Sequence, residues 1–294
     1  MRRRSIYPYV VIPAVCLCIF ILINAASGTV ALAEGDEITI KGSTTVLPIA
    51  QIMAEEFMDE NHDITISVQG GGSGVGIASL IDGTADIADS SRKMSRNELE
   101  RAKASGVSPY EITIALDGIA VVVHPSNIKT YLNTALLRAI YTGKISNWSE
   151  IGGENRKIVV ISRDTSSGTY EAFADLALSG QKVRPDALIT ASNQAVNLTV
   201  AQTPGAIGYL GLGYISKKVK TVRINNIECT KDTIRSGEYP LSRSLYMYTN
   251  GIPEGTVRRF MDYVLSRQGQ ELVDSQGFVS IRTHTIKNPD PDDT

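Results

Sequence analysis

Apolar and polar positions follow two alternating periodicities from about residue 37 onward. Runs rich in β-branched residues alternate with stretches whose apolar positions recur every three or four residues. This order of strand-like and helix-like segments is typical of an α/β fold. The extended segments that we predict are Ile38–Lys41, Ile64–Gln69, Ala85–Ala88, Ile112–His124, Ile158–Ser162, Ile207–Tyr214 and Ser244–Tyr248, and the helical ones are Leu47–Met58, Ile77–Asp82, Leu136–Tyr141, Tyr170–Leu178 and Val257–Asp274.

Two of the extended segments predict hinge strands between two lobes. Ile112–His124 is long, contains Gly118 and is too rich in β-branched residues for a helix, and Ser244–Tyr248 can return the chain. Two crossings imply a cleft, with hinges near Ile119 and Tyr246. We therefore expect residues 34–116 and 241–281 to form lobe I, residues 117–240 to form lobe II, and residues 282–294, rich in Asp and Pro, to form a flexible tail.

The N-terminus has the order of an export signal. Arg2, Arg3 and Arg4 precede an apolar run from Val10 to Ile23, and the small-residue triplet 31–33 precedes acidic residues. This order predicts a signal peptide over residues 1–33 that is cleaved after Ala33. The alternative is an uncleaved anchor, because the mildly apolar stretch is long enough for a bilayer. Either outcome places the protein in the periplasm or on the outer face of the cytoplasmic membrane.

Composition excludes some classes of partner. The 43% hydrophobic and 20% charged residues are typical of a globular protein. Removing residues 1–33 leaves 26 basic against 31 acidic residues. This mild acidity argues against a nucleic-acid partner, which requires a basic surface. Cys229 is the one cysteine beyond residue 33, so an intrachain disulfide cannot form there.

Three segments share one design, a β-rich run that ends in glycine, serine and threonine where a helical pattern begins. They are Ile38–Thr45, Gln69–Gly76 and Ser162–Thr169. Each offers free backbone N–H groups and a hydroxyl at the positive end of a helix, which makes a local anion site. One such turn alone is more often a capped helix. Because the carboxyl ends of strands face the ligand crevice in open α/β sheets, three turns together favour convergence on one small anion.

Arg163, in the third segment, is the strongest single candidate for an anion ligand. A guanidinium offers two parallel donors to an oxyanion and stays charged where water is excluded. The alternative is a surface ion pair with the neighbouring Asp164. The Gly70–Gly76 run lacks the Lys-Ser/Thr ending of a nucleotide phosphate loop, and the Gly-x-Ser-x-Gly elbow of a serine hydrolase is absent. The three histidines are scattered, so we expect neither a catalytic metal nor a cofactor.

At these turns the sequence resembles the phosphate-binding proteins (PstS-like) of phosphate ABC importers, from about Ile38 to Ile281. The resemblance rests on six pieces in family order: Gly42–Val46, Gly70–Gly74, Ala85–Arg92, Lys144–Trp148, Arg163–Thr169 and Thr203–Tyr209. It implies a type II periplasmic-binding-protein fold, α/β with two lobes joined by two hinge strands, that closes over a dehydrated phosphate. By position it implies the phosphate ligands Thr44, Thr45, Ser73, Ser90, Ser91, Arg163, Ser167, Gly168 and Thr169.

The sequence departs from one branch of that family at Ser91, where the branch has an aspartate that accepts the phosphate proton and repels sulfate. Asp89 and Asp164 are the nearby candidates for such an acceptor. The resemblance implies a non-enzymatic, monomeric binding protein that captures inorganic phosphate and delivers it to the permease subunits of an ABC importer. The alternatives are a carrier of sulfate, molybdate or tungstate, and a secreted phosphatase, for which we find neither metal cluster nor activated nucleophile.

Overall fold

The computed structural model describes residues 36–281, and the predicted signal segment 1–33 and tail 282–294 lie outside them. Ten strands of the described residues form one connected sheet, with the order β2-β1-β3-β10-β4-β8-β6-β7 along its main path and with β9 and β5 attached through β4. The strands are β1 Asp36–Gly42, β2 Ile64–Gly70, β3 Ile87–Ser90, β4 Pro109–Val123, β5 Tyr131–Leu132, β6 Val159–Arg163, β7 Leu188–Thr190, β8 Ala206–Gly211, β9 Lys220–Ile224 and β10 Ser242–Asn250.

Helices follow most of these strands, in the alternation that the sequence predicts. They are α2 Leu47–Glu60, α3 Ser73–Ile81, α4 Arg96–Ala104, α5 Thr134–Tyr141, α6 Gly168–Leu178, α7 Asn193–Gln202, α8 Lys231–Arg235, α9 Gly255–Leu265 and α10 Arg267–Ser275, with short 3₁₀ turns η1 Trp148–Ile151 and η2 Leu212–Tyr214. No helix between residues 36 and 281 combines the length and the apolar character that crossing a bilayer demands.

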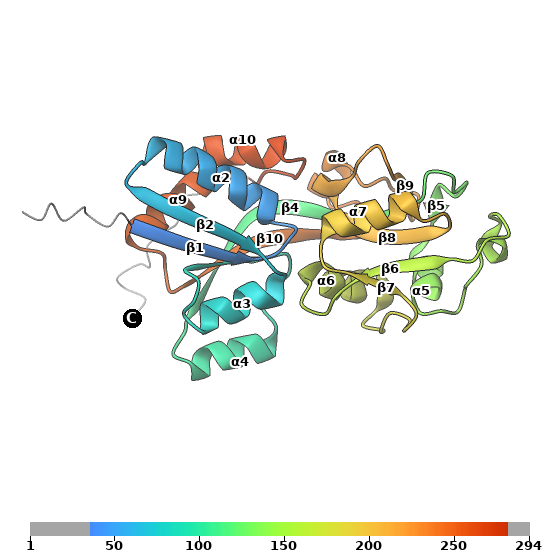
Figure 1. Ribbon diagram of the computed structural model, residues 1–294, viewed down its shortest axis with the longest axis horizontal. Coiled ribbons are helices and arrows are strands. Elements are labelled where there is room, and N and C mark those ends of the chain that lie inside the picture. Colours follow the sequence, from blue (N-terminus) through green and yellow to red (C-terminus); the bar gives the residue numbers. More distant parts are fainter. Residues whose placement is uncertain (1–35, 282–294) are drawn as a thin grey trace, which may run out of the picture. The chain divides into compact units, whose positions relative to one another are not determined.

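Strand β4 is shared between two groups of partners. Its first part, from Pro109 to Gly118, pairs antiparallel with β10, and its last part, from Ile119 to Val123, pairs with β8 and β9. Figure 1 shows β4 and β10 side by side, leading from the helices α2, α9 and α10 toward the strands β8 and β6. The chain therefore crosses between the two groups twice, once along β4 and once along β10.

Three buried clusters hold these elements together. The first core joins β1, β2, β4 and β10 to α2 and α9, and the second core contains only residues from Ile119 to Leu241 together with Val279. Along β10, Leu245 and Met247 face the first core, whereas Tyr246 and Tyr248 face a third cluster beneath α3 and α4. Side chains alternate between the faces of a strand, which explains this division. The two tyrosines are packing residues.

One helix prediction was wrong. The segment Val257–Asp274 forms two helices, because Ser266 adopts an extended ψ of 167° and caps α10 by accepting from the Gly269 N–H at 3.1 Å. Gly269 permits the tight turn, since a Cβ there would lie 2.3 Å from the Tyr263 carbonyl oxygen. The sequence also failed to reveal α4, whose nine residues bury only Ala102 and which a capping box of Ser95 and Glu98 starts.

Candidate functional site

Each of the three predicted turns lies between the end of a strand and the start of a helix. The first joins β1 to α2, the second joins β2 to α3, and the third joins β6 to α6. A fourth helix start, that of α7, reaches the first turn, because Asn193 donates from Nδ2 to the hydroxyl of Thr45 at 2.9 Å. Four positive helix ends thus come close to one place, which favours a bound anion there.

Four buried hydroxyl groups from these turns and from the end of β3 form what we call the hydroxyl cluster: Thr45, Ser73, Ser91 and Thr169. The hydroxyl oxygens of Thr45 and Thr169 lie 2.9 Å apart. Ser91 donates from its backbone N–H to Ser73 Oγ at 3.0 Å, and their hydroxyl oxygens lie 3.4 Å apart. All four side chains are at most 1% exposed, so the cluster gathers donors in a site with little water.

Gly168 lies against Ser73 and Ser91 and directly precedes Thr169, so it connects the two pairs of hydroxyls. A Cβ at this position would lie 2.3 Å from Ser73 Oγ and 2.8 Å from Ser91 Oγ, closer than real Cβ atoms approach. Ser166 makes the next contact between the turns, because its carbonyl accepts the Gly74 N–H at 3.0 Å and its hydroxyl oxygen lies 3.1 Å from the Gly71 carbonyl oxygen. The third turn therefore packs directly against the second, and glycine at 168 is what allows the approach.

Arg163 is buried, with 1% of its surface exposed. It donates from Nε to the Thr190 carbonyl at 3.1 Å and from Nη2 to the Ala191 carbonyl at 3.0 Å, and its Nη1 is buried without a partner. Asp164 lies 3.7 Å from Nη2 and is one third exposed. Burial lowers the pKa of Arg163 from its usual value. The alternative of a surface ion pair fails, because the guanidinium is not at the surface.

Three of the predicted ligands direct their hydroxyls elsewhere. Ser90 donates to the carbonyl of Arg92 at 2.6 Å, and Ser167 caps α6 by accepting from the Tyr170 N–H at 3.3 Å. The hydroxyl of Thr44 receives Asn193 Nδ2 at 3.3 Å, at the margin of the cluster. For Ser90 and Ser167 the side chain serves the local backbone, as serines at turns and helix starts commonly do.

The sequence reasoning missed Asp117, Asn193 and Arg243. Arg243 and Asp117 are directly paired across β10 and β4, and Arg243 donates from Nε and Nη2 to Asp117 Oδ2 at 3.0 and 2.8 Å. The other carboxylate oxygen accepts the Leu212 N–H at 2.9 Å. The signal that could have found this pair is an aspartate inside one of the two segments predicted to cross between lobes and an arginine directly before the other, because unpaired charge is not tolerated where such segments are buried.

Arg243 also reaches the hydroxyl cluster. Its Nη2 lies 3.1 Å from Thr169 Oγ1 and 3.4 Å from Thr45 Oγ1, and its Nη1 donates to the Ser91 carbonyl at 3.2 Å. Asp117 is fully buried, and burial raises the pKa of its carboxyl, an effect that Arg243 and backbone N–H groups oppose.

Of the two candidate proton acceptors, Asp89 and Asp164, only Asp89 has a buried oxygen without a partner. Asp89 is 1% exposed and burial raises its pKa well above the usual range. It lies beside the first turn, since its carbonyl accepts the Ser43 N–H at 2.9 Å. Asp164 instead accepts from the backbone and side chain of Ser166.

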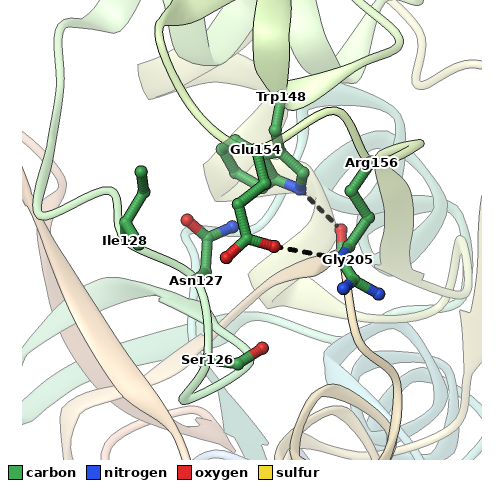
Figure 2. Close-up of a pocket in the computed structure, with 7 residues that line it drawn as sticks. All are labelled: Ser126, Asn127, Ile128, Trp148, Glu154, Arg156 and Gly205. Carbon is green, nitrogen blue, oxygen red and sulfur yellow. Dashed lines mark hydrogen bonds and ion pairs between the residues drawn. The ribbon is translucent and has the colours of Figure 1, made fainter.

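Within residues 36–281 no group of three or more histidine, cysteine, aspartate or glutamate side chains is arranged to hold a metal ion. One small pocket lies away from the cluster, where the Lys144–Trp148 and Thr203–Tyr209 segments meet. Figure 2 shows the Trp148 indole N–H directed at the Gly205 carbonyl, 2.9 Å away, with Glu154 and Arg156 beside it. Its cavity of about 10 Å³ has room for one water at most, so these two motifs serve packing.

Comparisons with known proteins place the chain among binding proteins. A model of the PBP superfamily domain matches residues 26–268. The phosphate-binding protein PstS of Bacillus subtilis is 33% identical over 277 residues, which cover 89% of this chain and 91% of the relative.

Two solved structures have similar folds. One, described as a phosphate ABC transporter substrate-binding protein from Clostridium perfringens with bound phosphate, is 30% identical with a TM-score of 0.78, over 84% of this chain and all of that one. The other, an ABC-type phosphate transport receptor from Vibrio cholerae, is 32% identical with a TM-score of 0.71, over 83% of this chain and all of that one.

Proposed function

The chain belongs to the PstS family of phosphate-binding proteins within the PBP superfamily, and from this membership we propose that it captures inorganic phosphate for an ABC importer. Its fold is the α/β periplasmic-binding-protein fold of the phosphate-binding structures. The export pattern of residues 1–33 supports capture outside the cytoplasm, in the periplasm or on the outer face of the membrane. The permease subunits of the importer are the proposed partners, and we propose that the protein acts as a monomer.

The hydroxyl cluster is the observation that carries this proposal. Thr45, Ser73, Ser91 and Thr169 bring buried donors from separate segments within hydrogen-bonding distance of one another. Together with the N–H groups of four helix starts they suit a small tetrahedral oxyanion, which has acceptors in all directions. Arg163 has a buried and unpartnered Nη1, and the partly exposed Asp164, 3.7 Å from its Nη2, balances its charge only in part.

Backbone N–H groups complete the proposed set of ligands. Gly168 lies at the start of α6, where N–H groups have no partner within the helix, and Thr44 lies in the turn that precedes α2. Ser90 and Ser167 contribute through the backbone geometry of their turns, because their hydroxyls are engaged locally. This refines the nine residues that the sequence suggested: five act through side chains and four through the backbone.

The lobe boundaries of the sequence analysis are retained as part of the proposal. Residues 34–116 and 241–281 would form one lobe and residues 117–240 the other. The second core supports this, since nearly all its members lie between Ile119 and Leu241. Because the donors come from both lobes, they meet only when the cleft is closed, so phosphate binding is coupled to closure.

Selectivity for phosphate over sulfate requires an acceptor for the phosphate proton. Ser91 replaces the carboxylate of one family branch, and its hydroxyl can accept as well as donate. We assign the acceptor of the phosphate proton to Asp89, because it lies next to the first turn and its buried Oδ1 has no partner, whereas sulfate has no proton to offer this oxygen. The affinity of Asp89→Asn for sulfate should then come closer to its affinity for phosphate, whereas Asp164→Asn should leave the preference for phosphate over sulfate unchanged.

Calorimetric titration of the purified protein with phosphate, sulfate, molybdate and tungstate tests the proposal directly. We expect one site per chain and tightest binding to phosphate. Tighter binding of another oxyanion would reassign the substrate, and absence of binding to any of the four would overturn the function. The proposal also excludes hydrolysis, so incubation with phosphomonoesters and common divalent metals should give no turnover.

A further inference from the structure

The guanidinium of Arg243 has a donor that its present partners satisfy weakly. Nη2 carries two protons and has three acceptors around it, at 2.8 Å on Asp117 and at 3.1 and 3.4 Å on the hydroxyls of Thr169 and Thr45. Bonds from a guanidinium to a charged oxygen are normally about 2.7–2.9 Å long, so the proton aimed at the two hydroxyls is only loosely engaged. An anion oxygen beside these hydroxyls would give it a full partner.

The balance of charge around the cluster points the same way. Arg163 and Arg243 are both buried, and the nearest carboxylate of Arg163 is the partly exposed Asp164 at 3.7 Å. Burial lowers the pKa of Arg163, and the charge of Arg243 adds to the effect. Asp117 neutralises one of the two cations. Two buried cations beside one ionised buried carboxylate favour the entry of a further negative charge.

We infer that Arg243 is a second phosphate-binding cation, contributed by the strand that joins the two groups of elements, and that Asp117 is the residue that positions it. The inference rests on the proposed phosphate function and assigns one more ligand to that site. Arg243 touches Thr45 beside α2, Thr169 in α6 and the Ser91 carbonyl after β3. A phosphate bound there would link the crossing strand β10 to helices that pack in different cores.

Asp117 suits a positioning role because three hydrogen bonds hold its carboxylate in place. Its Oδ2 takes two donors from Arg243 and its Oδ1 takes the Leu212 N–H, so the carboxylate is held on both sides and its charge is offset by the guanidinium. Asp117 lies on β4 one residue before Gly118, where β4 leaves its pairing with β10 and begins its pairing with β8. Two hydrogen bonds to one carboxylate oxygen fix the plane of the guanidinium.

Titration of the full-length protein with inorganic phosphate tests the inference. Removing Arg243 alone would leave Asp117 buried and unpaired, so the main variants change both residues: Asp117→Asn with Arg243→Gln, and Asp117→Leu with Arg243→Met. Apolar pairs often replace a buried ion pair without loss of stability, and melting temperatures without phosphate identify the variants that fold. Arg184→Gln, which removes an arginine paired with Asp186 outside the cluster, controls for the loss of an ion-paired arginine.

We expect both double variants to bind phosphate at least about tenfold more weakly than wild type, and Arg184→Gln to stay within about twofold. The loss should be larger above the second ionisation of phosphate, where the ligand is the dianion, than below it. Asp117→Asn should weaken binding in the wild-type background but change it by less than about twofold when Arg243 is already glutamine, since no guanidinium remains to be positioned.

The outcomes separate this inference from the proposed function. If wild type binds phosphate and a folded double variant binds it equally well, Arg243 is not a ligand and the inference is overturned while the function stands. If wild type does not bind phosphate, the function itself fails. If Asp117→Asn weakens binding equally in both backgrounds, Asp117 does not act through Arg243 and its positioning role is overturned.

Discussion

The hydroxyl oxygens of Thr45 and Thr169 lie 2.9 Å apart although 124 positions separate the two residues in the chain. Thr45 precedes α2, which packs in the first core, and Thr169 belongs to the first turn of α6, whose residues pack in the second. A contact of this length between groups anchored in different cores requires both to be held in place. The structure is therefore in the arrangement in which the proposed ligands face one another.

Gly168→Ala should prevent this approach. The added Cβ would lie 2.3 Å from Ser73 Oγ and 2.8 Å from Ser91 Oγ, so the third turn must move away from the second. We expect a loss of phosphate affinity of roughly tenfold or more in calorimetry, because a shift of this size breaks several ligand contacts together.

The matched control is Gly74→Ala, in the facing helix α3. Its Cβ would meet the Ser166 carbonyl at 3.5 Å, an ordinary contact, and alanine favours the helix. Gly74→Ala should therefore bind phosphate within about twofold of wild type. Equal losses in the two variants would show that crowding at 168 has no special effect.

Arg163→Ala should weaken phosphate binding at least about tenfold, because a charge-assisted hydrogen bond is lost from a buried site. Arg163→Lys keeps the charge but lacks the planar fork that holds the Thr190 and Ala191 carbonyls, so its affinity should fall between those of wild type and alanine. Side-by-side titrations at one pH and salt concentration make the comparison. Wild-type affinity in Arg163→Ala would remove Arg163 from the site.

Much of the fold was readable from local patterns. The strand β1 and the helix α2 were predicted to within two residues because each has a clear periodicity, with Ile49, Met53 and Phe57 on one face of the helix. The break at Ser266 was not readable, since the apolar spacing continues across it. What splits the helix is a backbone turn that depends on Gly269 packing against the end of α9.

The sequence predicted the residues of the site only where they lie together within one turn. Thr45, Ser73 and Thr169 belong to turns whose composition predicts a helix start, so the sequence identified them as candidates. Arg243 and Asp117 lie 126 positions apart, and their pairing follows from the register of β4 against β10. No single-sequence pattern encodes such a register. The direction of the Ser90 and Ser167 hydroxyls likewise depends on turn geometry rather than on residue type.

The ion pair between Arg92 and Glu171 should help to hold the site closed. Arg92 Nε lies 2.7 Å from Glu171 Oε2, and Arg92 is also paired with Glu98 at 2.7 Å. The first residue follows Ser91 and the second lies in α6, so the pair joins the same segments as the hydroxyl cluster. Glu171→Gln should lower phosphate affinity by about two- to fivefold, and less at high salt, because the pair is partly exposed.

Glu100→Gln is the control for that variant, since Glu100 forms an exposed ion pair with Arg96 within α4. Titration with phosphate at two salt concentrations should show no change for Glu100→Gln. A Glu171→Gln protein whose affinity matches wild type at low salt would contradict a closing role for the pair.

Asp89 should make the stability of the protein depend on pH in a direction opposite to that of most aspartates. Burial holds its pKa well above the value of about 3.9 that an unfolded aspartate has. Between these two pKa values the native state keeps a proton that the unfolded state has lost, so stability falls as the pH rises through this window. Asp89→Asn is neutral at every pH and should remove this contribution to the pH dependence of stability.

We expect wild type and Asp89→Asn to melt closest together near about pH 4, and the variant to melt higher by a few degrees near about pH 8, when melting is followed without phosphate. A difference in melting temperature that stays constant across the whole range would show that Asp89 does not titrate in this window.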